Sequence, residues 1–171
     1  MDHFGNFLTQ KMYTNNTSNA VIAYTGYLLG YDILADAANS PEIQKLLDSA
    51  YKEINQTLEA ELGVDPAQQE AFAKKARAKY CDKVIVDKVS RHAKDPIRKL
   101  GPQDRLVAPC RMALKHGIYP KTLIDTIAKA LYFDEPTDES AMKLKEMRQI
   151  HGIEYVLQNV CEMDKDEPLY A

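Results

Sequence analysis

The sequence has little of the residues that mark several common classes of protein. It contains no tryptophan, seven glycines and three cysteines in 171 residues. The cysteines are odd in number, and no Cys-x-x-Cys pair occurs. This favours buried, reduced thiols in a cytoplasmic protein over a disulfide framework or a thiolate metal site. No Gly/Ser-rich linker divides the chain, so residues 1–171 are predicted to form one domain.

Long apolar stretches and a strong net charge are missing as well. No apolar run approaches the roughly 18 residues of a membrane helix, and the first residues lack the basic start and apolar stretch of a secretory signal. We therefore expect a cytoplasmic protein without a membrane partner. The formal net charge of −3 argues against broad affinity for nucleic acid, which needs a clustered positive field.

Sequence signatures of nucleotide and metal sites are also absent. No Gly-x-Gly-x-x-Gly turn, Gly-x-x-x-x-Gly-Lys-Ser/Thr loop or His-Glu-x-x-His segment occurs. The histidines are scattered along the chain, which is typical of solvated or capping residues: His3, His92, His116 and His151. The sequence predicts neither a phosphate cradle nor a metal centre in this chain.

What the sequence does contain is a succession of helix signals. Ser40-Pro41 and Asp65-Pro66 each place a capping side chain before a proline at the first helical position. Gly63 and Gly152 stand where helices end, and Thr137-Asp138-Glu139 provides another start. Apolar residues recur at helical spacing between these signals. The pattern predicts an all-α fold.

Two stretches are less regular. The apolar triplet Val84-Ile85-Val86 resembles a strand, but it lies in a longer stretch without clear alternation, so we predict a helix that Pro96 ends. The run Gly101-Pro102-Gln103-Asp104 is expected to start the next helix, which would end at His116-Gly117. The first helix, His3 to roughly Tyr31, has a polar middle that is expected to interrupt or bend it near Asn15 to Asn19.

The polar middle of this first helix contains the first candidate site. At about 100° per residue, Lys11, Asn16 and Asn19 fall within about 140° of arc, so one lysine and two carboxamides can converge on one cavity. A lysine can act there as a general base, and carboxamides can stabilise a carbonyl or alkoxide oxygen. The same pattern is compatible with a polar bend or an exposed polar face.

A basic segment contains the second candidate site. Five lysines and arginines surround the break at Pro96: Arg91, Lys94, Arg98, Lys99 and Arg105. They can form a pocket for a phosphate or a polyhydroxyl substrate. The alternative is a solvated basic turn balanced by Asp95 and Asp104.

Both segments resemble the family of mannitol-1-phosphate and mannitol dehydrogenases. Lys11, Asn16 and position 19 have the Lys-x4-Asn-x2-His spacing of that family's catalytic helix. Arg91 and Lys99 have the Arg-x7-Lys spacing of its substrate-contacting pair. The similarity extends over roughly residues 4–134. Further matching runs are Ala23-Tyr24-Thr25-Gly26-Tyr27, Pro96-Ile97-Arg98-Lys99-Leu100, Asp104-Arg105-Leu106 and His116-Gly117-Ile118.

The resemblance implies a fold and separate functions for two domains. It implies a multi-helix C-terminal domain of the 6-phosphogluconate-dehydrogenase C-terminal-like type, which closes over a polyol or polyol phosphate substrate. A Rossmann-like nucleotide-binding domain, absent from residues 1–171, would bind most of the NAD cofactor. No metal is implied. We further expect Phe4, Phe7 and Leu8 to be exposed, because they would pack against that domain.

The resemblance also implies roles for individual residues. Lys11 would be the general base, and Asn16 would polarise the substrate oxygen. The residues that would hold the polyol chain or its phosphate are Arg91, Lys99 and the neighbouring Arg98. Position 19 departs from the family pattern, because Asn19 replaces a histidine and a carboxamide does not titrate near neutral pH.

Two functions follow as hypotheses from these observations. The first is the substrate-binding and catalytic domain of an NAD-dependent sugar-alcohol dehydrogenase. The second is a non-catalytic helical interaction or regulatory module that reuses the same scaffold. Only the dehydrogenase hypothesis requires that four polar residues lie close together: Lys11, Asn16, Arg91 and Lys99.

Calorimetric titration of this chain with NAD should show no measurable binding. The reason is that the sequence contains no glycine-rich turn to hold the cofactor's phosphates. A clear micromolar affinity would instead assign the cofactor site to this chain.

Overall fold

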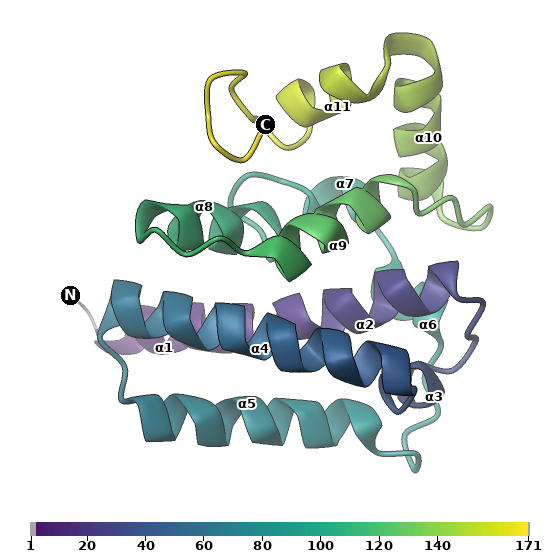
Figure 1. Cartoon of the computed structure of the whole chain (residues 1–171). Coiled ribbons are helices and arrows are strands. Elements are labelled where there is room, and N and C mark those ends of the chain that lie inside the picture. The colour runs from purple at the N-terminus through teal and green to yellow at the C-terminus, as the bar shows by residue number, and fades with distance from the viewer. Residues whose placement is uncertain (1–2, 171) are drawn as a thin grey trace.

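The computed structural model describes residues 3–170 of the chain, with side chains from residue 5 onward. Within this range the structure is helical and contains no strand (Figure 1). An isolated antiparallel bridge joins Ile33 to Lys88. The helices are α1 (His3–Lys11), the π-helix η1 (Met12–Asn16), α2 (Thr17–Leu28), α3 (Leu34–Ala38), α4 (Pro41–Leu62), α5 (Pro66–Cys81), α6 (Val89–Ala93), α7 (Pro96–Lys99), α8 (Val107–Lys115), α9 (Lys121–Leu131), α10 (Glu139–His151) and α11 (Ile153–Asn159). The predicted all-α fold is confirmed.

The predicted caps set the boundaries of the longest helices. The Ser40 hydroxyl accepts a hydrogen bond from the backbone N–H of Ile43 (3.3 Å), and the Asp65 carboxylate accepts one from Gln68 (2.9 Å). These bonds satisfy N–H groups that have no partner within the helix. Gly63 ends α4 with a φ of 65°, a left-handed conformation that glycine adopts without strain.

Helix α2 lies at the centre of the molecule. It contacts α3, α4, α6 and α9, and Figure 1 shows α5 beyond α4 on one side and α8 and α9 on the other. The side chains of Val21, Ile22 and Ala23 are completely buried, and the Tyr24 hydroxyl donates to the carbonyl of Ala93 at 3.0 Å. No described helix is both long and apolar enough to cross a lipid bilayer.

The interruption of the first helix is a π-helical turn over Met12–Asn16, slightly before the expected position. A π turn pairs each N–H with the carbonyl five residues earlier and occurs mostly as a short insertion in α-helices. Three side chains donate hydrogen bonds to carbonyls around this turn: Asn15 to Lys11 (3.1 Å), Ser18 to Thr14 (2.7 Å) and Tyr80 to Asn15 (3.0 Å). The polar residues of this segment therefore satisfy the backbone where the helix widens.

The prediction of a helix over Val84-Ile85-Val86 is wrong. This triplet forms a turn between α5 and α6, with exposed fractions of 87%, 47% and 78%. The Asp82 carboxylate accepts the N–H of Val84 (2.9 Å), a local bond that competes with helix formation. The bridge to Ile33 then fixes the chain in an extended conformation until α6 begins at Val89.

The helix expected to start at Gly101 begins only at Val107. The intervening residues form turns, and the carbonyl of Arg105 accepts a hydrogen bond from the Thr17 hydroxyl at 2.7 Å. That carbonyl is thus bonded to α2, across the interior of the molecule. The expected end at His116-Gly117 agrees with the structure, in which α8 ends at Lys115.

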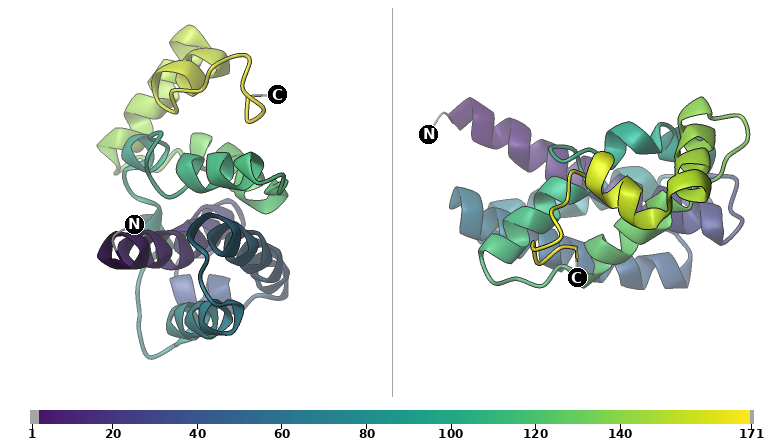
Figure 2. Two further views of the ribbon diagram at one scale, coloured as in Figure 1. Left: turned by 90° about the vertical axis from the view of Figure 1, so that its left-hand side faces the viewer. Right: turned by 90° about the horizontal axis from the view of Figure 1, so that it is seen from above.

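The start of the chain presents an apolar surface, as predicted. Phe7 and Leu8 on α1 are 51% and 49% exposed, whereas the Phe4 side chain lies outside the described residues. Figure 2 shows α1 at the edge of the molecule, with its first turns projecting past the neighbouring helices.

The close packing of α2 against α3 leads to a stability prediction for Gly26. A Cβ at this position would lie 2.9 Å from the Cβ of Ala37. We expect Gly26→Ala to lower the free energy of unfolding by about 1–3 kcal/mol in urea denaturation, because over-packing outweighs the gain in helix propensity. The matched control is Gly5→Ala in α1, where the added Cβ meets nothing within 4 Å and stability should not fall. A Gly26→Ala protein as stable as the parent would contradict the prediction.

Candidate functional site

Asn16 and Asn19 lie in the wall of one cavity of about 240 Å³. The cavity lies between the end of η1, the start of α2, α3, the end of α5, the segment that joins α5 to α6, and α6. Its lining residues are Asn16, Asn19, Leu34, Ala35, Lys79, Tyr80, Asp82, Ile85, Asp87 and His92. The structure therefore brings together the two carboxamides that the sequence singled out.

Three polar side chains form a continuous hydrogen-bonded chain along this wall. The Asn19 Nδ2 atom is 2.8 Å from His92 Nδ1, and His92 Nε2 is 2.9 Å from Asp87 Oδ2. A carboxylate can only accept, so His92 donates through Nε2, and its Nδ1 in the neutral ring accepts from the Asn19 amide. The other Asp87 oxygen pairs with Arg91 at 2.6 Å. The bonds from His92 and then Arg91 lower the pKa of Asp87.

The Asn19 carboxamide is only partly satisfied. Its Oδ1 atom is buried and has no hydrogen-bond partner among the described residues. Leaving a buried acceptor unpaired costs about 1–3 kcal/mol of stability. Tyr80 lies beside it. Burial raises the pKa of the Tyr80 hydroxyl, and the neighbouring polar side chain of Asn19 opposes that rise.

Lys99 lies behind the cavity wall rather than in it. Its side chain is buried, and its ammonium donates to the backbone carbonyl of His92 and lies 6.0 Å from the centre of the Tyr24 ring. Desolvation, followed by the nearby charges of Arg105 and Arg98, lowers the pKa of Lys99 from 10.5 to about 8. Lys99 therefore supports the residue that contacts Asn19.

Two of the three arginines of the predicted basic segment, Arg91 and Arg98, form ion pairs in different places. The Arg91 side chain is 75% exposed and pairs with Asp87 at the cavity rim. Arg98 pairs instead with Asp95 at 2.8 Å and Asp104 at 3.2 Å. The structure thus places Arg91 against Asp87, which lines the cavity, and leaves Arg98 in the acidic surroundings that the alternative interpretation anticipated.

Lys11 is exposed at the end of α1 and does not line the cavity. It follows Phe7 by four residues and Leu8 by three, the spacing that puts side chains on one face of a helix. Lys11 therefore shares a face with the exposed apolar surface at the start of the chain, next to the turn that carries Asn16.

His92 is a cavity residue that the sequence did not predict. Asn19 and His92 are 73 residues apart, and nothing in their spacing indicates a contact. One signal was available: His92 directly follows Arg91 in the segment with the Arg-x7-Lys spacing. The folding of α6 against α2 is what places its ring on the Asn19 amide.

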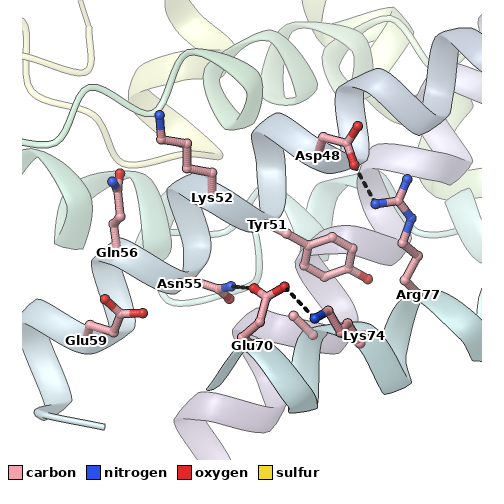
Figure 3. Close-up of a pocket in the computed structure, with 10 residues that line it drawn as sticks. Asp48, Tyr51, Lys52, Asn55, Gln56, Glu59, Glu70, Lys74 and Arg77 are labelled. Atoms are coloured by element: carbon pink, nitrogen blue, oxygen red, sulfur yellow. Dashed lines mark hydrogen bonds and ion pairs between the residues drawn. The ribbon is translucent and has the colours of Figure 1, made fainter. Parts of the chain in front are cut away.

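A larger groove of about 370 Å³ runs between α4 and α5 (Figure 3). Its charged side chains largely neutralise one another: Arg77 pairs with Asp48 (2.5 Å) and Lys74 with Glu70 (3.3 Å). None of the predicted site residues lines it. Among the side chains that the structure describes, those of residues 5–170, no group of three or more His, Cys, Asp or Glu is arranged to hold a metal ion.

The fold and the cavity define an all-α domain in which packed helices enclose a small polar site. Comparison with known sequences supplies the family. A family model described as the mannitol dehydrogenase C-terminal domain matches residues 3–164, so the chain belongs to that family.

Curated relatives agree with this assignment. The chain is 35% identical to the mannitol-1-phosphate 5-dehydrogenases of Bacillus pumilus and Bacillus subtilis, over 96% and 100% of its length. A protein of the same name from Paenarthrobacter aurescens is 28% identical over 99% of the chain. The matched regions make up 43%, 45% and 44% of these proteins, so the chain spans less than half the length of the relatives.

The buried Lys99 ammonium leads to a prediction about pH. Its pKa is lower in the folded chain than in the unfolded chain, so between about pH 8 and 10.5 the unfolded chain binds more protons. The Lys99 contribution to stability therefore rises with pH across this window. Unfolding in urea should show that the stability of the parent relative to Lys99→Met increases from pH 7.5 to pH 9.5, on the order of 1 kcal/mol or more. The comparison cancels the buried tyrosines and cysteines, which both proteins share. A constant difference would contradict the prediction.

Proposed function

We propose that this chain is the substrate-binding and catalytic domain of an NAD-dependent sugar-alcohol dehydrogenase acting on mannitol 1-phosphate or a similar polyol. The observation that carries the proposal is the placement of Asn16 and Asn19 in one cavity wall, at the positions where the family resemblance puts its catalytic helix. The names of the relatives support the substrate class.

In this proposal Lys11 removes the proton of the substrate hydroxyl as hydride leaves the carbon. Asn16 donates to the same oxygen as it becomes a carbonyl. Because Lys11 is exposed beside Phe7 and Leu8, the reacting centre would lie where this face meets the nucleotide-binding domain, and closure of the two domains would bring the lysine into the site. Arg91 would hold the polyol chain or its phosphate at the cavity rim.

The cofactor is assigned to another domain. Dinucleotide phosphates are held at a glycine-rich turn between a strand and a helix, and residues 3–170 form no strand. The nicotinamide, when bound by the nucleotide-binding domain, supplies the hydride acceptor. The residues of this chain bind and orient the polyol and accept its proton.

A non-catalytic helical module remains the second candidate. The observations that favour it are that Lys11 does not line the cavity and that Asn19 stands where the family resemblance places a titrating imidazole. The two candidates differ in the expected effect of replacing Lys11, because only the dehydrogenase should lose activity.

The test requires the protein joined to its nucleotide-binding domain, assayed for NAD reduction with mannitol 1-phosphate and with mannitol. Replacing Lys11 with alanine should lower kcat/KM by roughly 10²- to 10⁴-fold, because the general base is lost. The control is Lys45→Ala on the exposed face of α4, which should leave the rate unchanged. Equal rates for both variants, or no turnover by the parent, would favour the interaction module.

A further inference from the structure

Helix α1 is held to the rest of the molecule by few contacts. None of residues 5–11 is buried, and Figure 2 shows the first turns of this helix projecting past its neighbours. Among the described residues, a single side-chain hydrogen bond joins α1 to a helix other than η1. In this bond Gln10 Nε2 donates to Oε1 of Gln69 on α5 at 2.8 Å. Gln10 directly precedes Lys11, so the bond is made next to the proposed general base.

Gln69 is completely buried, and both ends of its side-chain amide are bonded. Its Nε2 donates to Thr14 Oγ1 at 3.0 Å and to Asn55 Oδ1 at 2.8 Å, and its Oε1 accepts from Gln10. These two bonds use both N–H groups of the amide. A buried amide in a satisfied network is costly to displace, because any other position leaves polar groups unpaired. Gln69 is therefore a firm partner for the residues on either side of Lys11.

The orientation of the Gln69 amide is set from the groove between α4 and α5. The ionised Glu70 carboxylate can only accept, so Asn55 turns its Nδ2 atom toward it at 3.2 Å (Figure 3). The Asn55 oxygen then faces Gln69 and requires a donor, which places the Gln69 Nε2 atom there and leaves its oxygen for Gln10. The order of donors and acceptors thus runs in one direction from the groove to α1.

We propose that Gln69 is a positioning residue that anchors α1 and thereby fixes the direction of the Lys11 side chain. The inference rests on the proposed function, in which Lys11 is the general base. Side chains of an α-helix change direction by about 100° per residue, so bonds at Gln10 and Thr14 together determine where Lys11 points. The π turn η1 separates α1 from α2. Without the bond to Gln10, the orientation of α1 depends chiefly on the backbone of that turn.

Loss of this anchor should affect turnover more than substrate binding. In the proposed function Lys11 removes the hydroxyl proton, whereas Arg91 and the carboxamides of α2 and η1 hold the polyol. A displacement of a reacting group by about 1 Å can lower a rate by roughly a hundredfold. We therefore expect kcat to fall while KM stays nearly the same.

Two substitutions remove the anchor in different ways. Gln10→Met removes the donor on α1 and leaves the bonds of Gln69 to Thr14 and Asn55 in place. Gln69→Met keeps a buried side chain of similar size but removes all three bonds. In the protein joined to its nucleotide-binding domain and assayed with mannitol 1-phosphate, each should lower kcat by about ten- to a hundredfold. Values of kcat are referred to the concentration of folded protein, so that a loss of stability is not counted as a loss of turnover.

The matched control is Gln44→Met. Gln44 is also a half-buried glutamine that joins two helices, since it accepts from Arg77 Nε at 3.1 Å across α4 and α5. It neither contacts α1 through a described hydrogen bond nor lines the cavity. This variant should keep the kcat of the parent.

A spectroscopic measurement on residues 1–171 tests the anchor without any assay of activity. Steady-state ¹H–¹⁵N NOE values report motion of backbone amides on the picosecond to nanosecond timescale. In Gln10→Met the values for α1 should fall below those of the parent, while the values for α4 stay unchanged.

The outcomes distinguish this inference from the proposed function. An active parent whose kcat is unaffected by Gln10→Met, or is lowered equally by Gln44→Met, would overturn the role of Gln69 alone. Gln10→Met decides the matter if Gln69→Met does not fold. An inactive parent would overturn the proposed function, and the NOE values then judge the anchor: a more mobile α1 in Gln10→Met supports it, and an equally rigid α1 rejects it.

Discussion

The burial of α2 on nearly every side is the constraint on which the rest of the structure depends. From Ala20 to Gly26 each residue of this helix is buried, and a helix that is apolar all round must be enclosed by others. Helices α3, α4, α6 and α9 supply that enclosure. Gly26 allows α3 to approach closely, and α6 is held by the bond between Tyr24 and the Ala93 carbonyl. The position of α6 follows from this packing.

The same constraint explains how polar side chains are accommodated at the end of an apolar helix. Before Ala20 the chain turns polar, and the π turn shifts the direction in which successive side chains point. Thr17 and Ser18 are buried but bonded to carbonyls, which removes the cost of their burial. Asn16 and Asn19 are left facing the cavity beside α5 and α6. The site is thus built where the core helix changes from apolar to polar packing.

Electrostatics around this site are local and nearly balanced. Asp87 compensates Arg91 and orients His92, while Asp95 and Asp104 neutralise Arg98. Lys99 is the buried cation of the group, and its lowered pKa reflects desolvation more than any charge nearby. Two arginines of this basic segment, Arg91 and Arg98, form short ion pairs with aspartates beside α6 and α7.

The sequence by itself determined the local features of this protein. Caps at Ser40 and Asp65, the stop at Gly63 and the apolar spacing predicted the all-α fold, because these signals act within one helical turn. Spacing within one helix also singled out Asn16 and Asn19. Tertiary structure decided what depends on distant contacts: the turn at Val84-Ile85-Val86, the late start of α8, and the pairing of His92 with Asn19. Those outcomes depend on which segments meet in space, and a periodicity that describes one segment carries no information about its partner.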